Sequence, residues 1–385
     1  MRWRRLLRSF SELRNAETPV RHIRKVPFGA QRLAGMLMKV PFGTPCLAGM
    51  SGGYYMRIAD MHCDTVSKIY KARGRGENLG LRANNFSVDL EGMRKAGYLL
   101  QFFACFIDMA EYDEPYEALM GMIDIFDGEI QKNADLIGRV LCYDDIGRNT
   151  ENNRMSALLT LEEGGALGGS IEKLHKIYER GVRLVTLTWN YENELGYPNY
   201  RDENEPVCGR ARTDSGLKEC GVEFVKEMER LHMIVDVSHL GDAGFYDVAA
   251  NTAKPFAASH SNARSVASNV RNLTDDMIRI LADRGGITGI NFCPTFLRDG
   301  YTREEDCVSY ISDMVRHAIH IRNIGGIEVI GLGSDLDGIG GRLEIDKCSR
   351  MPLLGEALHD GGFSYDEVDL IMYKNVLRFI RDILK

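Results

Sequence analysis

Short apolar runs alternate with longer amphipathic segments along the chain from Arg57 onward. The runs are rich in Val, Ile, Leu and Phe, and the segments between them have helical periodicity. This alternation is typical of βα units with a parallel sheet. Eight runs are predicted to be strands: Arg57–Asp64, Tyr98–Ile107, Ala157–Glu163, Arg183–Asn190, Ile234–His239, Pro255–His260, Gly286–Phe292 and Val329–Asp335. Residues 56–385 are therefore predicted to form a single catalytic domain, a (β/α)8 barrel of the TIM type.

The segments between these runs carry apolar stripes at a period of about 3.6 residues. Several have Asp, Ser or Thr near their starts, as helix N-termini do. The predicted helices are Pro115–Lys132, Ile171–Arg180, Gly216–Leu231, Asp242–Ala250, Thr274–Arg284 and Arg303–Asn323, with Leu353–His359 and Tyr365–Ile383 closing the barrel. The alternating pair Val140 and Cys142 indicates one additional short strand.

Polar residues stand at the ends of several predicted strands, where a barrel of this type places its catalytic groups. They are His62, Asp64, Glu163, His239, His260 and Asp335. Residues two apart on a strand face the same side, so His62 and Asp64 are expected to point together and Cys63 away from them.

Three imidazoles and two carboxylates at one barrel mouth suit Zn²⁺ or another first-row divalent ion. Glu163 is the candidate bridge between two ions, because the following Gly164 and Gly165 allow a tight turn beside a crowded site. Glu162 is expected to face the other side of the strand. The alternative is that each residue is structural, but their joint placement favours a metal site. His175, His317 and His320 lie on predicted helices and are interpreted as solvated.

Six segments resemble the membrane (renal) dipeptidase family of zinc peptidases, which is related to the amidohydrolase barrels. They are Asp60–Thr65, Leu161–Gly165, Asp236–His239, Ala258–Ala263, Arg271–Asp275 and Gly333–Gly338. The resemblance extends from Ile58 to about Phe379, and the opening motif His-x-Asp distinguishes the family from relatives that begin with His-x-His.

The resemblance implies two zinc ions per chain. It places His62 and Asp64 on the first ion, His239 and His260 on the second, and Glu163 between them as the bridge. A hydroxide between the ions would attack the carbonyl of a dipeptide. Asp335 would be the acid/base, and a homodimer is expected from the family.

Arg271 resembles the family residue that binds the free carboxylate of the substrate, for which a planar guanidinium is suited. The alternative role is a contact with the helix that begins near Thr274.

Two neighbouring residues, Trp189 and Asn190, are assigned to substrate binding. Mammalian members have a histidine at the position of Trp189, where it helps to polarise the substrate carbonyl. An indole only donates a hydrogen bond, so either the metals and Asp335 suffice or the contact comes from Asn190 or the following loop. That loop, residues 191–215, is either a lid with Tyr191, Glu192 or Tyr197 near the substrate amine, or a solvated loop.

The net charge of −7 is unevenly distributed. Residues 1–55 carry ten Lys or Arg and two Glu, which gives +8 and leaves −15 for the rest. An acidic body argues against a nucleic-acid partner. The leader is predicted to be a poorly ordered basic extension, or to result from an upstream start in front of a native start at Met56.

Nine cysteines are scattered singly, as in a reduced cytoplasmic protein. No stretch approaches the ~20 apolar residues of a membrane helix, and no membrane anchor is expected.

The leading hypothesis is a zinc-dependent dipeptidase. One alternative is a barrel hydrolase of another small amide or lactone. The other is a non-catalytic barrel that binds metal and peptide, which only Trp189 supports.

Overall fold

The computed structural model describes residues 56–200, 209–301 and 306–385. The expected basic extension, residues 1–55, lies outside these ranges.

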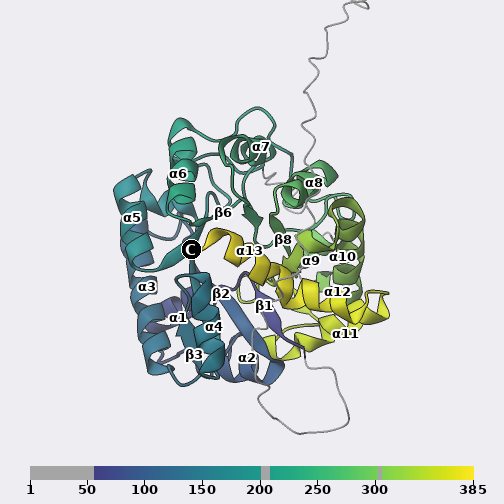
Figure 1. Ribbon diagram of the computed structural model, residues 1–385. Coiled ribbons are helices and arrows are strands. Elements are labelled where there is room, and N and C mark those ends of the chain that lie inside the picture. Colours follow the sequence, from purple (N-terminus) through teal and green to yellow (C-terminus); the bar gives the residue numbers. More distant parts are fainter. Residues whose placement is uncertain (1–55, 201–208, 302–305) are drawn as a thin grey trace, which may run out of the picture. The chain divides into compact units, whose positions relative to one another are not determined.

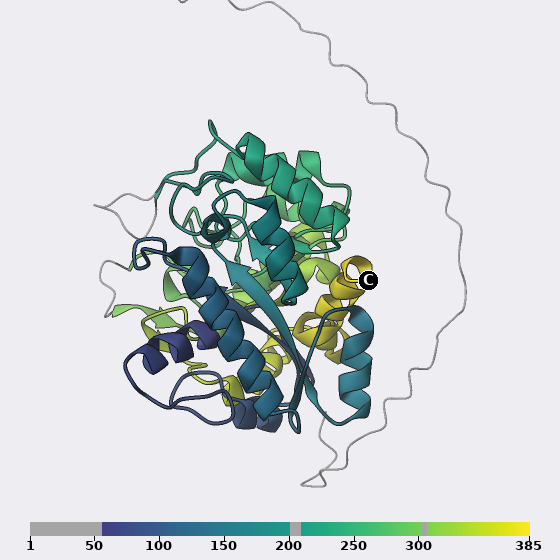
Figure 2. The same cartoon turned by 90° about the vertical axis from the view of Figure 1, so that its left-hand side faces the viewer.

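Eight parallel strands close into a ring, which confirms the predicted (β/α)8 barrel. They are β1 (Ile58–Asp60), β2 (Tyr98–Phe106), β4 (Met155–Glu162), β5 (Val182–Thr186), β6 (Ile234–Asp236), β7 (Ala257–Ala258), β8 (Ile287–Ile290) and β10 (Ile330–Leu332). Each pairs with the next in chain order, and β10 pairs with β1 to close the ring. In Figure 2 the long blue strands β2 and β4 cross the view between helices.

A ninth strand, β3 (Ile137–Arg139), pairs with the beginning of β4. It lies just before the Val140 and Cys142 pair that indicated an additional strand. A separate two-stranded sheet joins β9 (Val308–Ser309) to β11 (Arg342–Leu343).

Helices surround the ring (Figure 1). They are α1 (Thr65–Gly74), α2 (Leu90–Ala96), α3 (Pro115–Lys132), α4 (Tyr143–Glu151), α5 (Ile171–Glu179), α6 (Glu219–Arg230), α7 (Asp242–Asn251), α8 (Asp275–Asp283), α9 (Pro294–Leu297), α10 (Ile311–Gly325), α11 (Pro352–Asp360), α12 (Tyr365–Asp369) and α13 (Asn375–Ile383). A π-helical turn, Leu370–Lys374, connects α12 to α13. The sequence prediction missed α1, α2, α4 and α9. The predicted helix Arg303–Asn323 begins only at Ile311.

Several helices begin where the sequence provides a cap. Thr274 accepts a hydrogen bond from the Met277 N–H at the start of α8, and Ser170 caps α5 in the same way. Pro115 is the first residue of α3, where a backbone N–H would have no partner within the helix and its absence removes no hydrogen bond.

The apolar core has two parts. The larger cluster lies between the strands and the surrounding helices, whereas the smaller one fills the barrel interior. The interior cluster takes Ala59, Phe102, Leu158 and Leu184 from the strands and Phe379 from α13. In Figure 1, α13 (yellow) lies across the middle of the strand ring. One end of the barrel is therefore closed by a helix, and the site lies at the other end.

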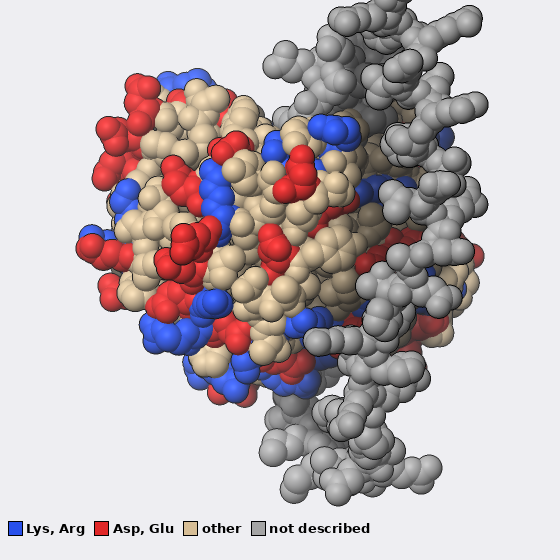
Figure 3. Space-filling model, turned by 90° about the horizontal axis from the view of Figure 1, so that it is seen from above, with Lys and Arg blue, Asp and Glu red and all other residues tan. Residues whose placement is uncertain are grey.

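Among the described residues, no helix is long and apolar enough to cross a bilayer. On the face shown in Figure 3, Lys and Arg side chains are intermixed with Asp and Glu. A phosphate backbone on this face would therefore meet both signs of charge.

Candidate metal centre and substrate pocket

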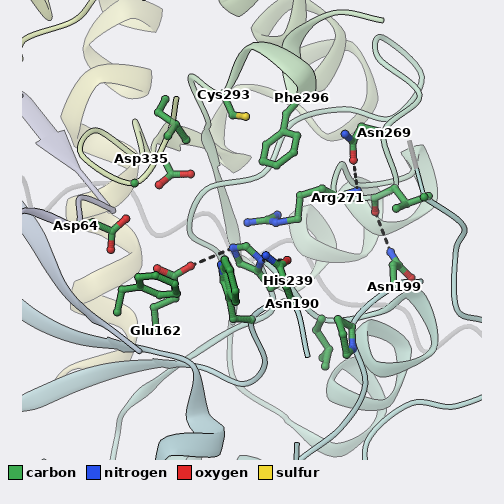
Figure 4. Close-up of a pocket in the computed structure, with 18 of the residues that line it drawn as sticks. Asp64, Glu162, Asn190, Asn199, His239, Asn269, Arg271, Cys293, Phe296 and Asp335 are labelled. Carbon is green, nitrogen blue, oxygen red and sulfur yellow. Dashed lines mark hydrogen bonds and ion pairs between the residues drawn. The ribbon is translucent and has the colours of Figure 1, made fainter. Parts of the chain in front are cut away.

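A pocket opens at the carboxyl ends of the strands, where the predicted site residues gather (Figure 4). Its lining includes Asp64, Glu162, Trp189, Asn190, His239, Arg271, Cys293, Phe296 and Asp335. Five of the strands end at least two residues before their polar residue: β1 ends at Asp60, β5 at Thr186, β6 at Asp236, β7 at Ala258 and β10 at Leu332. His239 and His260 therefore stand on the loops just beyond their strands, which is why the predicted strands were too long.

The Glu162 carboxylate lies among three imidazoles at the centre of this site. Its Oε2 is 3.1 Å from His62 Nε2, and its Oε1 is 3.1 Å from His239 Nε2 and 3.7 Å from His260 Nε2. Both carboxylate oxygens are thus used, each toward a different histidine. Figure 4 shows Glu162 and His239 pointing toward one another.

Two further carboxylates complete the cluster on the side of His62. Asp64 Oδ2 lies 3.7 Å from His62 Nε2, and Asp335 Oδ1 lies 3.9 Å from the same nitrogen. Gly338 leaves the room for this approach, because a Cβ there would collide with the carboxylates of both Asp64 and Asp335. A side chain at position 338 is therefore incompatible with the arrangement.

The hydrogen bonds of His239 and His260 assign their tautomers. His260 Nδ1 is 2.8 Å from Ser259 Oγ, whose own proton goes to Asp236 Oδ2 at 2.6 Å, so Nδ1 carries the proton of the ring. His239 Nδ1 likewise donates to Asn190 Oδ1 at 3.3 Å. Both Nε2 atoms consequently present lone pairs, and they lie only 3.1 Å apart.

This donor set fits metal ions. Two lone-pair nitrogens beside a carboxylate repel one another unless a cation lies between them. Two ligands of a tetrahedral zinc, each ~2.1 Å from the ion, lie about 3.4 Å apart. The separations of 3.1 to 3.7 Å around Glu162 agree with this value. His62 Nδ1 and Asp64 Oδ1 are also buried without a hydrogen-bond partner among the described residues.

The prediction that Glu163 faces the site is wrong, and Glu162 occupies the place expected for it. The Glu163 carboxylate accepts hydrogen bonds from the N–H of Gly165 and of Trp189 and from Asn193 Nδ2. Its backbone has φ of +88°, so the chain leaves the strand direction at this residue. Gly165 is needed because a Cβ there would collide with the carboxylate of Glu163. The glycine therefore makes room for Glu163 and not for a residue of the site.

A signal for the correct residue was present in the strand itself. Ser156, Thr160 and Glu162 alternate with Ala157, Leu159 and Leu161 along β4. The second set packs in the cluster that contacts the helices. Since only the other face leads to the barrel mouth, Glu162 shares its side with Ser156 and Thr160.

Arg271 points into the pocket from the loop after β7. Its Nη1 donates to Ser261 Oγ at 2.6 Å and its Nη2 to the carbonyl of His260 at 3.1 Å. Nε is buried with no partner among the described residues. The helix after it has a different cap, Thr274, so the alternative role of Arg271 at that helix is not supported by a contact. Burial lowers the pKa of the guanidinium to about 10.

Trp189 and Asn190 both line the pocket, as predicted, but they differ in their partners. The Trp189 ring lies 4.9 Å from Phe106 and 6.2 Å from His239 between centroids. Asn190 is the hydrogen-bond acceptor of His239. Asn190 thus orients a histidine of the cluster around Glu162, a role that the sequence did not suggest.

Three other sequence predictions concern residues outside this cluster. Cys63 is buried with its Sγ toward the carbonyl of Phe102, away from the site, as expected. His175 is half-buried beside Glu227, and His320 beside Asp275. His317, however, is fully buried, so its interpretation as a solvated residue is wrong. It accepts a hydrogen bond from the Ala263 N–H and donates to the carbonyl of Leu297.

Burial dominates the protonation of the cluster. It raises the pKa of the Glu162 and Asp335 carboxyl groups, against the lowering effect of the nearby His62. Burial also lowers the pKa of His260, and the charges of His62 and Arg271 add to that effect. Unpaired anions are thus unfavourable here, and cations would favour the ionised carboxylates.

Comparison with known proteins agrees with the geometry. A family model described as membrane dipeptidase, peptidase family M19, matches residues 54–385. A protein of Klebsiella pneumoniae from the pqqA 5′ region is 31% identical over 270 residues, which cover 70% of this chain and 97% of that protein. A Schizosaccharomyces pombe protein described as an uncharacterized dipeptidase is 31% identical over 305 residues, covering 76% and 71% of the two chains.

Solved structures share the fold. A metallopeptidase of Rhodobacter sphaeroides, liganded with a phosphinate mimic of the dipeptide L-Ala-D-Ala, has a TM-score of 0.76 at 22% identity and covers 86% of this chain and 100% of its own. The probable dipeptidase PvdM of Pseudomonas aeruginosa has a TM-score of 0.73 at 17% identity, with 85% and 95% covered. With a family model that spans nearly the whole described chain, the resemblance noted in the sequence is confirmed, and the protein belongs to the membrane dipeptidase family, peptidase family M19.

Proposed function

We propose that this metallodipeptidase holds two zinc ions around Glu162 and uses them to hydrolyse free dipeptides. The observation that carries the proposal is the position of Glu162, whose two oxygens face different histidines. His62 and Asp64 would hold the first ion, His239 and His260 the second, and Glu162 would bridge them. The ligand set is that of the sequence analysis with one glutamate exchanged for its neighbour.

Two zinc ions would supply a water of lowered pKa and positive charge for the developing oxyanion. The chain's own residues fix where this happens. Glu162, His62 and His260 are buried and His239 is half-buried, so little of their ionic contact is lost to solvent. Asn190 and Ser259 hold the rings of His239 and His260 by their Nδ1 atoms. The nitrogens that face the centre are thereby kept free of protons.

Asp335 would move the proton from the attacking water to the leaving amine. Its Oδ2 accepts a hydrogen bond from Asn291 Nδ2 at 2.9 Å, which leaves Oδ1 toward the cluster. The side chain lines the pocket, so it can reach a substrate. A carboxylate in this position satisfies the geometry required of a general acid/base.

Arg271 would bind the free carboxylate of the dipeptide. Its buried Nε lacks a partner, and each terminal nitrogen has a second hydrogen beyond the one donated. A carboxylate can therefore pair with the guanidinium in two-point fashion. A peptide with a longer or amidated C-terminal side would leave this cation without its counter-charge.

Trp189 cannot serve as the carbonyl-polarising histidine of mammalian members. Asn190 is close by, but its Oδ1 is already engaged by His239. Zinc ions, when bound, would supply the polarisation of the carbonyl, and Asn190 would contribute by orienting His239.

Metal analysis and a dipeptide panel test this proposal together. Purified wild type is expected to contain about two zinc ions per chain and to hydrolyse free dipeptides. Glu162→Ala should lose both metal and turnover. Zinc-free wild type with full activity contradicts the metal assignment, whereas a zinc-loaded protein that cleaves lactones or other small amides but no dipeptide favours the alternative hydrolase.

We also propose a cytoplasmic location. Six of the described cysteines, namely Cys63, Cys105, Cys142, Cys220, Cys293 and Cys348, are free thiols. This usage is typical of a reducing compartment. Fractionation of cells that produce the native protein checks the location, and recovery outside the cytoplasm would contradict it.

A homodimer remains a proposal from the family resemblance. Light scattering of the purified protein distinguishes a dimer from a monomer.

A further inference from the structure

Two aromatic rings form a wall beside the reaction centre. Phe106 ends β2, and its Cα is the cross-strand partner of Glu162. Trp189 packs on Phe106 with ring centroids 4.9 Å apart, and Tyr191 continues the row at 5.5 Å from Trp189. Phe106 and Trp189 are half-buried and line the pocket, so part of each ring is exposed to a bound molecule.

The wall is held in place from behind by Glu163. The buried carboxylate of this residue accepts the N–H of Trp189 at 2.8 Å, and Asn193 Nδ2 binds both the carboxylate and the carbonyl of Leu187. The turn that carries Trp189 is thus fixed on both sides of the indole. A surface fixed before binding loses little entropy when a ligand packs on it.

The direction of a bound dipeptide follows if the proposed function is correct, and the inference rests on it. The C-terminal carboxylate pairs with Arg271, and the scissile carbonyl lies at the cluster around Glu162. The N-terminal residue then extends beyond the cluster, away from Arg271. Its amine is attracted to the carboxylates of Asp64 and Asp335, which line the same pocket as the aromatic pair.

We infer that the wall of Phe106 and Trp189 is the subsite for the N-terminal side chain, and that the enzyme prefers dipeptides whose N-terminal residue is large and apolar. A leucine or phenylalanine side chain would bury apolar area against the two rings. A charged side chain would lose its hydration there without gaining a partner from either ring. Glycine would leave the wall uncovered.

Phe296 marks the other end of the pocket and gives a matched control. Its ring lies under the guanidinium of Arg271, with the cation 5.5 Å from the centroid. A substitution there should act on the C-terminal residue of the substrate. Phe296→Leu and Trp189→Ala therefore remove aromatic surface from two different subsites of one pocket.

The test measures kcat/KM of the zinc-loaded full chain on two series of dipeptides. The first varies the N-terminal residue over Gly, Leu, Phe and Asp before a constant alanine, and the second varies the C-terminal residue after a constant alanine. Wild type is expected to favour N-terminal Leu or Phe over Gly by about 10- to 100-fold. In Trp189→Ala this ratio should fall to within about threefold, and Trp189→Phe should restore most of it.

Phe296→Leu is expected to keep the wild-type preference among N-terminal residues and to change the preference among C-terminal residues, each measured as a ratio of kcat/KM values. Glu163→Gln should retain zinc and weaken the N-terminal preference, because it loosens the turn behind the indole. If N-terminal Gly, Asp and Phe are cleaved equally well by wild type, or if Trp189→Ala keeps the preference, the subsite is overturned while the dipeptidase activity stands. A zinc-loaded protein that cleaves no dipeptide overturns the proposed function and this inference with it.

Discussion

Glu162 and Glu163 are neighbours in the chain, but their carboxylates are used on opposite sides of the barrel wall. Glu162 faces His62 and His239, whereas Glu163 binds the backbone N–H of Trp189 and Gly165. Both carboxylates are buried, so each depends on protein partners, which also include His260 for Glu162 and Asn193 for Glu163. The carboxylate of Glu163 holds a turn, and that of Glu162 is the one proposed to bind ions.

Substituting the two glutamates should separate these roles. Glu162→Gln is expected to lose most bound zinc and activity, because a neutral amide is a poor bridge between cations. Glu163→Gln should keep about two zinc ions and lose about 1–3 kcal/mol of stability, as a charge-assisted acceptor is weakened. Zinc content and urea unfolding of both variants provide the measurements. If Glu163→Gln lost its zinc and Glu162→Gln kept it, Glu163 would be the bridging residue.

Asp335→Asn should uncouple metal binding from turnover. The amide keeps the shape of the side chain and can still contact Asn291, but it cannot carry a proton. We expect kcat to fall by at least about a hundredfold, as is common for loss of a general acid/base. The zinc content of Asp335→Asn and the KM of its remaining activity are compared with those of wild type. Equal loss of zinc and activity would mean that Asp335 is needed as a ligand.

Arg271→Lys should weaken recognition of the free carboxylate. Lysine keeps the charge but loses the planar two-point geometry, so KM is expected to rise by about tenfold or more. Wild type should cleave amidated dipeptides far less well than the free acids, and the variant should narrow that difference. Assays of each dipeptide as free acid and as amide give the ratio of the two rates for wild type and for Arg271→Lys. If this ratio were the same in both proteins, Arg271 would have no role in binding the substrate carboxylate.

Ser259→Ala should lower zinc affinity without changing the ligands themselves. The hydroxyl accepts the His260 Nδ1 proton and donates its own to Asp236. Loss of such an outer partner typically costs about 10- to 100-fold in metal affinity. Thr186→Val is the matched control, because Thr186 donates to the same carboxylate but not to His260. Competition with a chromophoric chelator measures the zinc affinity of both variants. If both lost the same affinity, the loss would come from the weakened hydrogen bonding of Asp236 and not from His260.

His317 should make stability depend on pH in a defined range. Burial lowers the pKa of this histidine from 6.5 to about 4, because the charged ring would lose its hydration, and the hydrogen bond to the Leu297 carbonyl opposes this effect only in part. Its contribution is fully present above pH 6.5 and is lost as pH falls toward 4, with a total on the order of 3 kcal/mol.

His317→Gln removes this titration, so the difference in unfolding free energy between the two proteins should change across that range. Urea unfolding at pH 7, 5.5 and 4.5 measures it. If the unfolding free energies of the two proteins differed by the same amount at all three pH values, the pKa of His317 would not differ between the folded and the unfolded state.

Sequence periodicity was sufficient to predict the eight strands and their order, because each is a compact apolar run between amphipathic helices. It placed the strand ends too late by two or more residues at β1, β5, β6, β7, β8 and β10, since apolar residues such as Leu187 and Val237 continue into the loops. The helices α2 and α9, of seven and four residues, span two turns or less and were missed for that reason.

The side of a strand was harder to predict than its position. β4 is buried on both faces, so the alternation of hydrophobicity that reveals direction in a half-exposed strand is nearly lost. The pair Gly164 and Gly165 then directed attention to Glu163. The partners of His317 were also beyond prediction, because Ala263 and Leu297 are distant from it in sequence and meet it only in the folded barrel.

The first and last strands of the ring meet at a seam, where Asp60 accepts hydrogen bonds from the backbone and hydroxyl of Ser334. His62 and Asp64 lie on one side of this seam and Asp335 on the other. Their approach requires that some 270 intervening residues are already in place. The five proposed metal ligands are all synthesised before β10, but the ring that positions His62 closes only when β10 pairs with β1. A nascent chain cleaved before that point would carry every proposed ligand and still lack Asp335 and the closed barrel.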